Sequence, residues 1–330
     1  MGALKRLIPL WIKAPLSVFL NEHKKLPCKL VMAHVKQSFL LHRSISEERR
    51  AAALAVSHQA NYKYLSKLYA HKVPGLAGDY SQGAPSPVQP IWVLWWQGEH
   101  DAPAIVKNCI ASMRKNAGHH PVYVIDQNNY SDFAHISPCI LNKLKNGSLS
   151  FTHFSDYYRM ALLAQNGGLW IDASIFVQQP ICDDLFAHPL FTMRNPDLDT
   201  SNISGWNWTV GVIGGWKGNT LFQITADLLE LYWQDHDFLI DYFIFDYMIR
   251  IVYDSLPAVK AQIDAIPPNN RDFYLLQKYV NSPAVQYEDI FLHDPDTWLY
   301  KLSWKGSYVH TTPSGEPSVF HRWLKENTPT

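Results

Sequence analysis

An aspartate and an arginine three residues apart, followed by a second aspartate, form the most informative stretch of the sequence. The stretch reads FSDYYRMALLAQNGGLWIDASIFVQQP over residues 154–180. Ser155 is predicted to cap a helix that ends at Asn166 and Gly167. Asp156 and Arg159 stand at positions i and i+3, so on this helix their side chains share one face. Asp172 follows the short apolar strand predicted over 169–171, and open α/β sheets bind ligands at the carboxyl ends of their strands. The sequence therefore predicts a carboxylate and guanidinium site at the end of this strand.

A carboxylate at that position needs a partner, because burying it is costly unless it is paired, hydrogen-bonded or bound to a cation. A divalent cation, Mn²⁺ or Mg²⁺, that bridges Asp172 to a diphosphate would meet this need and would help the diphosphate to leave. Ser174 stands two residues after Asp172. A serine hydroxyl is a weaker metal ligand than a carboxylate. We therefore expect a cation that is held loosely, or through water, at these two positions.

The order of these motifs resembles the capsular polysaccharide synthesis family of bacterial sugar transferases and the related mannosyltransferase-like transferases. The shared pattern is S-D-x-x-R followed by G-G-L-W-I-D-A-S. In that group the first aspartate and the arginine help to hold a nucleotide sugar, and the carboxylates of a DxD motif bind the ribose and a metal ion. The resemblance implies that Asp156 and Arg159 contact the sugar and phosphate and that Asp172 contacts the metal and ribose. Ser174 replaces the last aspartate of the DxD motif.

Tryptophans carry the resemblance further along the chain. The stretch I-W-V-L-W-W-Q-G over 91–98 stands where the family has its first strand and a tryptophan that stacks on the nucleotide base. The resemblance makes Trp96, or alternatively Trp95, the base-stacking candidate, since an aromatic ring offers a flat apolar face. Three more tryptophans among the glycines of 204–219 predict a sugar-binding groove: Trp206, Trp208 and Trp216. For all five, a place in the core is the alternative.

Two aspartates in D-Y-F-I-F-D, Asp241 and Asp246, match another stretch that is typical of the family. Five residues on a helix correspond to a rotation of about 140°. Both carboxylates can therefore face one cleft only if a helix begins between them. We favour Asp241 as the one near the sugar, where it would orient a hydroxyl or stabilise positive charge at the anomeric carbon. The alternative is a carboxylate that stabilises a helix N-terminus. The predicted catalytic set is Asp172, Asp241 and Asp246.

The stretch W-L-Y-K-L-S-W-K over 298–305 is similar to the closing segment of the family. In this stretch and just after it lie four positive or metal-binding side chains that could contact a leaving diphosphate: Lys301, Lys305, His310 and His321. In GT-A transferases, the fold that the resemblance implies, a late histidine often completes the metal shell, and the spacing does not choose between the two. The predicted metal ligands are Asp172, Ser174, His310 and His321. The predicted substrate-binding residues are Trp95, Trp96, Asp156, Arg159, Gly168 and Lys305.

Three segments are predicted along the chain. S-I-S-E, with Ser44 as N-cap and Glu47 three residues later, begins a helical pattern that continues to about residue 70. Residues 1–73 are therefore predicted to be a helical segment, and residues 74–90, with four prolines, a linker. From 91 to 330 short apolar strands alternate with helices. This pattern indicates an α/β domain with a mixed central sheet, and the resemblance identifies it as a GT-A fold.

Bulk properties exclude some partners. The 29 Lys and Arg balance the 29 Asp and Glu, so a nucleic acid is not expected as partner. The four cysteines are far apart without a CxxC pair, which indicates neither a disulfide framework nor a cysteine zinc site and favours the cytoplasm. The apolar stretch over 7–20 is interrupted by Pro9, Lys13 and Pro15 and is too short to span a bilayer. With its flanking lysines it could lie on the inner face of the membrane, or pack on the domain.

The resulting hypothesis is a metal-dependent hexosyltransferase. It would move a hexose from a nucleoside-diphosphate sugar, a UDP-sugar by expectation, to a polysaccharide or lipid-linked glycan during the synthesis of capsule or other cell-surface polysaccharide. The resemblance implies that the anomeric configuration is retained. A non-catalytic carbohydrate-binding or assembly protein with the same fold is the alternative. A metal phosphohydrolase is disfavoured, because the chain lacks a second cluster of carboxylates or histidines for a two-metal centre.

Overall fold

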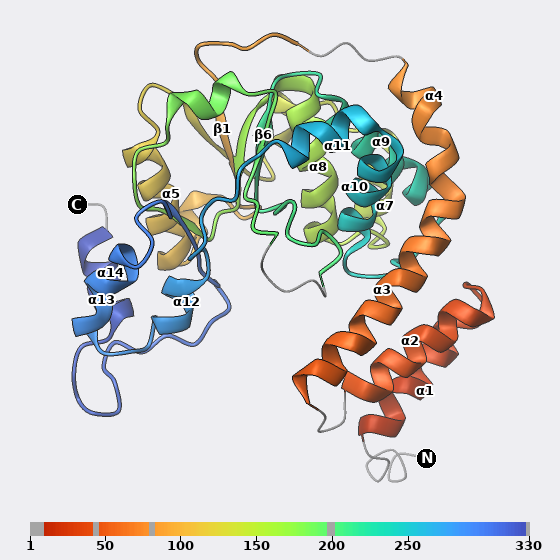
Figure 1. The fold of residues 1–330 in the computed structure, drawn as a ribbon, viewed down its shortest axis with the longest axis horizontal. Helices are drawn as coiled ribbons and strands as arrows, with labels where there is room; N and C mark the ends of the chain where they lie inside the picture. The colour runs from red at the N-terminus through yellow and green to blue at the C-terminus, as the bar shows by residue number, and fades with distance from the viewer. Residues whose placement is uncertain (1–9, 42–45, 79–82, 197–201, 328–330) are drawn as a thin grey trace.

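A five-stranded mixed sheet forms the centre of the protein in the computed structural model, which describes residues 10–41, 46–78, 83–196 and 202–327 (Figure 1). The strand order is β2-β1-β3-β6-β5. Strand β1 pairs in parallel with β2 and β3, whereas β6 is antiparallel to both β3 and β5. The strands are β1 (Ile91–Leu94), β2 (Val122–Ile125), β3 (Gly168–Ile171), β5 (Leu190–Thr192) and β6 (Val212–Gly215). A small antiparallel sheet joins β4 (Ile175–Val177) to β7 (Leu299–Lys301).

The strands alternate between two hydrophobic layers, as a sheet that is covered on both faces requires. In β3, Leu169 and Ile171 pack on the side of α5, while Trp170 packs on the side of α8. A third layer of apolar side chains lies under the C-terminal helices. The helices after β1 are α5 (Ala104–Asn116), α6 (Tyr130–Phe133), α7 (Pro138–Lys145), α8 (Phe151–Asn166), α9 (Thr220–Asp235), α10 (Ile244–Ser255), α11 (Pro257–Asp264), α12 (Leu275–Tyr279), α13 (Tyr287–Leu292) and α14 (Val319–Asn327).

The predicted fold class is confirmed: the chain is α/β, its central sheet is mixed and its N-terminus is helical. One helix start was predicted wrongly. Helix α8 is capped by Ser150, whose hydroxyl accepts from the backbone N–H of His153, and not by Ser155, which lies inside the helix. Asp156 and Arg159 therefore stand in the middle of α8, and the helix ends at Asn166 before Gly167, as predicted.

The N-terminal extension consists of α1 (Leu10–Glu22), α2 (Cys28–Leu41), α3 (Glu47–Tyr69) and the short α4 (Val73–Ala77). The predicted N-cap Ser44 lies outside the described residues, and the structure gives Ser46 that role, with its hydroxyl accepting from the N–H of Arg49. Helices α1 and α2 stand apart from the sheet, whereas the later part of α3 packs on the main body (Figure 1). Leu65, Tyr69 and Val73 are fully buried in the same core as α9 and α10.

Residue 73, where the predicted helical segment ends, is the first residue of α4 and lies in a helical region that shares the main core. Residues 83–90 lack helix and strand and lead directly into β1, so only part of the predicted 74–90 linker is irregular. Among the described helices, none combines the length and the apolar character needed to cross a membrane.

Gly168, the first residue of β3, has no room for a side chain. Its φ is +97°, and an added Cβ would lie 2.3 Å from the carbonyl oxygen of Pro90. We expect Gly168→Ala to lower the free energy of unfolding by about 2–4 kcal/mol through strain and overpacking. Urea unfolding of the variant measures this loss.

Gly118→Ala is the matched control, because Gly118 has a φ of +60° but nothing within 4 Å of its added Cβ. It should show the backbone strain alone, on the order of 1 kcal/mol. Equal losses in the two variants would contradict the steric explanation.

Candidate active site

Asp172 lies one residue after β3, at the edge of the sheet where the parallel strands β1 and β3 both end. Its backbone N–H donates to the carbonyl of Gly211 at 2.8 Å. Its carboxylate Oδ1 accepts from the indole Nε1 of Trp170 at 3.0 Å. An added Cβ on Gly211 would lie 2.9 Å from Oδ2, so a glycine there leaves space for the carboxylate. The strand end and its neighbour thus fix the position of Asp172.

Two cations hold the carboxylate of Asp172. Nη2 of Arg159 lies 3.2 Å from Oδ1, and Nζ of Lys301 lies 2.8 Å from Oδ2. Lys301 reaches the site because β7 pairs with β4, which places Lys301 opposite Ile175. Burial acts to raise the pKa of Asp172, but Lys301 and Arg159 outweigh it and hold this pKa below its ordinary value. Asp172 is therefore an ionised carboxylate at neutral pH.

Arg159 is fixed from several sides and is only 4% exposed. Its Nη1 donates to the backbone carbonyl of Val210, and its guanidinium lies over the rings of Trp170 and Phe245, 4.7 and 5.4 Å from their centroids. Asp156, on the same face of α8 as predicted, lies 3.6 Å from Nη2. The guanidinium is thus placed between two carboxylates and two aromatic faces.

A third carboxylate, Asp246, joins this group from the first turn of α10 and accepts from the indole Nε1 of Trp208 at 3.0 Å. Burial raises the pKa of Asp156 to about 7, with further increases from Asp246 and Asp172. Burial likewise raises the pKa of Asp246 to about 6. The acidic group therefore contains one firmly ionised carboxylate and two that can hold a proton near neutral pH.

Asp241 lies elsewhere, although we favoured it over Asp246 as the aspartate nearest to the sugar. Helix α10 begins at Ile244, between the two aspartates. The carboxylate of Asp241 accepts from Nδ2 of Asn61 in α3 at 3.1 Å and from the N–H of Phe243 at 2.8 Å. Burial raises its pKa. The structure thus brings Asp246, and not Asp241, next to Arg159, because the backbone turns before α10.

Two tyrosines that were not predicted from the sequence, Tyr242 and Tyr274, border the acidic group. Asp156, Asp172 and Asp246 add to the effect of burial in raising the pKa of Tyr242, which is 62% exposed. Asp172 acts in the same way on Tyr274, which is 46% exposed. No spacing in the sequence pointed to either tyrosine. Both offer an exposed ring and a hydroxyl beside the carboxylates.

The predicted base-stacking tryptophans have different surroundings. Trp96 packs among the rings of Tyr130, Phe151 and Phe154, with centroid distances of 5.1–5.5 Å. Trp95 instead makes an edge contact with Trp304, at 5.4 Å. The ammonium of Lys305 lies over the ring of Trp304, with Nζ 4.9 Å from the ring centroid. The predicted residues Trp95 and Lys305 thus meet through Trp304, at the end of β1 that lies beside Asp172.

The three tryptophans of residues 204–219 also lie in different surroundings. Trp208 is buried and binds Asp246, and Trp216 donates to the carbonyl of Phe186. Trp206 lies at the ring of Tyr274, with a centroid distance of 6.0 Å. Of the buried N–H groups that have no hydrogen-bond partner among the described residues, three belong to residues predicted to bind substrate: Nε of Arg159, Nε1 of Trp95 and Nε1 of Trp206. Unpaired buried donors are costly in a folded protein, so a ligand that accepts from them would be stabilising.

The predicted metal ligands do not converge. His310 and His321 are exposed and face each other, with their Nδ1 atoms 3.3 Å apart. In the described parts of the chain, no group of three His, Cys, Asp or Glu side chains with metal-ligand spacing includes Asp172. Ser174 is buried, and its backbone carbonyl accepts from the N–H of Leu302. The donor set therefore does not fit a cation at Asp172 unless Lys301 moves away.

Gly168 lies at the opposite end of β3 from Asp172, about 13 Å away at the usual rise of a strand. This separation contradicts a direct role for Gly168 in the same substrate site. Its N–H donates to Oε1 of Gln89, so its role is to start the strand.

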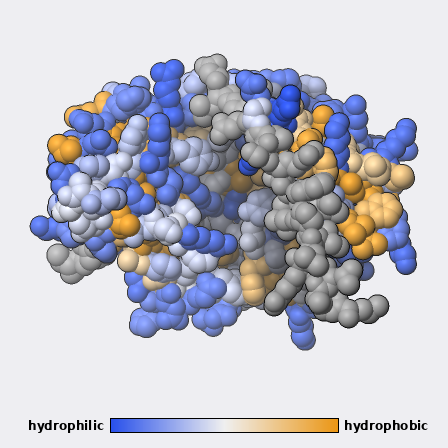
Figure 2. Space-filling model, turned by 90° about the horizontal axis from the view of Figure 1, so that it is seen from below, coloured by the Kyte–Doolittle hydropathy of each residue, from blue (hydrophilic) through white to orange (hydrophobic). Residues whose placement is uncertain are grey.

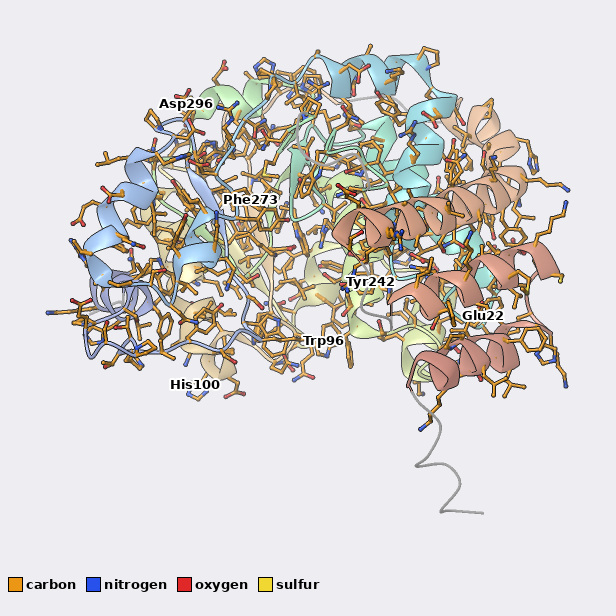
Figure 3. All side chains as sticks on the ribbon, turned by 60° about the horizontal axis from the view of Figure 1, so that its bottom comes forward. Glu22, Trp96, His100, Tyr242, Phe273 and Asp296 are labelled. Carbon is orange, nitrogen blue, oxygen red and sulfur yellow. The ribbon has the colours of Figure 1, made fainter. Side chains whose placement is uncertain are left out.

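The molecule is hollowed near the middle of one face, between the portion that carries α12–α14 and the portion that carries α1–α3 (Figure 2). Trp96 and Tyr242 lie near the middle of the molecule when that face is turned forward (Figure 3). The exposed ring of Tyr242 lies on this side of the molecule (Figure 3).

The raised pKa values predict that stability falls as the pH increases. Because the pKa of Asp156 is about 7 in the folded chain and well below that in the unfolded chain, the folded state binds more protons between these values. We expect the free energy of unfolding to fall by on the order of 2 kcal/mol from pH 5 to pH 7.5. Asp156→Asn should remove most of this slope in denaturant titrations at both pH values, whereas Asp296→Asn, at an exposed position, should keep it. Equal slopes in wild type and Asp156→Asn would contradict the assignment.

Residues 42–320 match a family model described as capsular polysaccharide synthesis protein. Among curated proteins, none matches the sequence. A solved structure that resembles the chain is the PaToxG glycosyltransferase, with 14% identity and a TM-score of 0.38, over 67% of this chain and 90% of that one. Another is the apo structure of the WbbM bifunctional glycosyltransferase, with 10% identity and a TM-score of 0.38, over 76% of this chain and 52% of that one. The family match includes every residue of the site, from Asp156 to Lys301.

Proposed function

From the premise that the chain belongs to the capsular polysaccharide synthesis protein family, we propose that it is a glycosyltransferase that uses a nucleoside-diphosphate sugar. The observation that carries the proposal is the ionised carboxylate of Asp172 held between Arg159 and Lys301 at the end of β3. The mixed sheet with this carboxylate at a strand end supports the predicted GT-A arrangement. We propose a hexose donor, with UDP as the expected nucleotide.

The charges of the site suit the two parts of such a donor. A diphosphate needs positive charge and hydrogen-bond donors, which Lys301 and the guanidinium of Arg159 supply. Sugar and ribose hydroxyls need acceptors, which the carboxylates of Asp172, Asp156 and Asp246 supply. The edge contact between the half-buried Trp95 and the exposed Trp304 supports the predicted stacking of the base.

In the proposed transfer the bond between the anomeric carbon and the diphosphate oxygen breaks, and a bond to an acceptor hydroxyl oxygen forms. The departing diphosphate gains negative charge, which Lys301 and Arg159 stabilise from preorganised positions. The acceptor hydroxyl loses its proton to the departing phosphate oxygen or to solvent. The proposal also includes retention of configuration and a polysaccharide or lipid-linked glycan as acceptor, both of which the family resemblance suggests.

The predicted Mn²⁺ or Mg²⁺ stays a prediction. When bound, such a cation would neutralise charge on the diphosphate. Both carboxylate oxygens of Asp172 are already engaged, by Lys301 on one side and by Arg159 and Trp170 on the other. We therefore assign the positive charge at the diphosphate to the side chains of Lys301 and Arg159.

Calorimetric titration with UDP, GDP, CMP and their sugars tests the donor site, with and without Mn²⁺. The expected result is binding of one nucleotide by the wild type and at least tenfold weaker binding by Asp172→Asn. Binding of glycans without binding of any nucleotide would contradict the proposal and support the non-catalytic carbohydrate-binding alternative.

We also propose that α1 contacts an anionic membrane surface, which would place the enzyme at the inner face of the membrane. Three apolar side chains at helical spacing are exposed on it, Leu16 at 49%, Phe19 at 40% and Leu20 at 59%. Exposed lysines lie nearby at Lys13, Lys24 and Lys25. An apolar stripe flanked by basic side chains is typical of helices that lie on anionic membranes.

Flotation with vesicles that contain anionic lipid tests this contact. The double substitution Phe19→Ser with Leu20→Ser should reduce the floating fraction strongly, whereas Val285→Ser, at a site that is 79% exposed elsewhere, should not. Point substitutions are preferable to removal of residues 1–25, because Glu22 at the end of α1 hydrogen-bonds His34. Equal flotation of the double variant and the wild type would contradict the proposal.

A further inference from the structure

Two histidines and an aspartate form a second polar cluster, away from the candidate active site. His119 and His120 lie in the turn between α5 and β2, and Asp183 is the first residue of the short helix η4 (Asp183–Ala187). The possible ligand atoms of the three side chains all lie within 4.8 Å of one another. Within the described residues, this is the one cluster of three His, Cys, Asp or Glu with such spacing.

The cluster lies at the end of the sheet opposite to Asp172. His120 lies two residues before the start of β2, and its ring contacts the backbone of Gln89, which lies two residues before the start of β1. The side chain of Gln89 accepts from the N–H of Gly168, at the start of β3. Strands β1, β2 and β3 are parallel, so these starts share one edge, while Asp172 lies at the other edge.

Backbone carbonyls orient both rings. Nε2 of His119 lies 3.1 Å from the carbonyl oxygen of Pro87, and Nδ1 of His120 lies 3.0 Å from the carbonyl oxygen of Gln89. A ring nitrogen that donates its proton to a carbonyl leaves the other nitrogen with a free lone pair, which is the usual arrangement of histidines that bind metals. In the other tautomer of His120, Nδ1 accepts from the N–H of Gln89 at 3.2 Å, so metal binding would select the tautomer in which Nδ1 donates to the carbonyl of Gln89.

In these tautomers three electron-pair donors face one another. Nε2 of His120 lies 3.3 Å, and Nδ1 of His119 lies 3.9 Å, from Oδ1 of Asp183. Bonds of about 2.0–2.1 Å at tetrahedral angles place ligand atoms roughly 3.3 Å apart. A cation between them would therefore need only small movements of the exposed side chains of His119 and Asp183.

We propose that His119, His120 and Asp183 bind one divalent transition-metal ion, Zn²⁺ by the chemistry of the ligands, with water in the fourth position. Two imidazoles and one carboxylate are a ligand set that suits Zn²⁺. His120 supplies a rigid base for the site, because it is 4% exposed and packs on Phe186 with a centroid distance of 3.9 Å. The ion would join η4 to the turn before β2 and so stabilise the edge of the sheet. This site is independent of the proposed transferase function.

Titration of the full-length, tag-free and metal-stripped protein with Zn²⁺ tests the proposal, with Co²⁺ as a spectroscopic probe. The expected result is one Zn²⁺ per chain with a rise in Tm, and about tenfold or more weaker binding in His119→Ala and in Asp183→Asn. Both substituted side chains are more than half exposed, so both variants should fold.

His310→Ala is the matched control, because His310 and His321 form the other close histidine pair but offer only two ligands. It should bind Zn²⁺ as the wild type does and show the same rise in Tm. Unchanged affinity in both His119→Ala and Asp183→Asn, or loss of binding in His310→Ala, would overturn the assignment. So would the absence of Zn²⁺ binding by the wild type.

Discussion

Asp172→Asn is expected to lower kcat/KM for the sugar donor by about a hundredfold or more while the chain stays folded. Removing one preorganised charged group from an active site typically has an effect of this size. The asparagine keeps the shape of the side chain and an acceptor for the indole N–H of Trp170. It removes the charge that positions the guanidinium of Arg159 and the ammonium of Lys301. Steady-state kinetics with the donor identified by titration, together with Tm, measures both quantities.

Asp296→Asn is the matched control for charge removal, because Asp296 is exposed and lies away from Trp96 and Tyr242 (Figure 3). It should retain full turnover. Full donor turnover in Asp172→Asn would remove the central argument for the proposed function. A loss of turnover accompanied by a large fall in Tm would have to be repeated with Asp172→Glu before it counted as support.

Lys301→Met is expected to have the second largest effect, with a fall in kcat of about a hundredfold. The methionine keeps much of the length of the side chain but removes the ammonium that lies 2.8 Å from Asp172. If this ammonium performs the role that a metal has in related sites, wild-type turnover should persist in EDTA. Mn²⁺ should then restore part of the turnover to Lys301→Met, because Oδ2 of Asp172 becomes accessible to a cation. Steady-state turnover with EDTA and with Mn²⁺ measures both effects.

Lys325→Met is the matched control, because Lys325 is an exposed lysine in the last turn of α14 and belongs to none of the predicted site residues. Its effect on turnover should be much smaller. The EDTA measurements should also be made on Asp183→Asn, in which the proposed zinc site is absent, so that loss of that ion is not mistaken for loss of a metal at Asp172. Complete dependence of wild-type turnover on Mn²⁺ or Mg²⁺ would contradict the role of Lys301 and support the cation predicted from the sequence.

The sequence predicted the centre of the site because local spacing determines it. Asp156 and Arg159 share a helix face because they are three residues apart, wherever the helix begins. The wrong prediction of Ser155 as the N-cap therefore did not affect their pairing. Asp172 follows an apolar strand that begins after a glycine turn, which also is a local pattern. For these three residues the physical rules of helix and strand were sufficient.

The rest of the site depends on contacts between distant segments, which spacing cannot supply. Lys301 reaches Asp172 through the pairing of β4 with β7, across 129 positions of the chain. The choice between Asp241 and Asp246 depended on where α10 begins. His310 and His321 pair with each other near the C-terminal helix and not with Asp172. The cluster of His119, His120 and Asp183 has no metal-binding spacing in the sequence, and only the fold brings it together.

A buried chain of hydrogen bonds links the N-terminal helices to the start of α10. Glu22 bonds His34 at 2.6 Å, His34 bonds Asn61 at 2.7 Å, and Asn61 donates to Asp241 at 3.1 Å. Replacing His34 or Asn61 would leave a buried polar atom of the other without its partner, which costs more than the bond itself contributes. Among homologous chains these four positions are therefore expected to covary, so that an apolar residue at one is accompanied by apolar residues at the others. Asp241 would then hold the helical extension of this chain, α1 and α2, to the main domain.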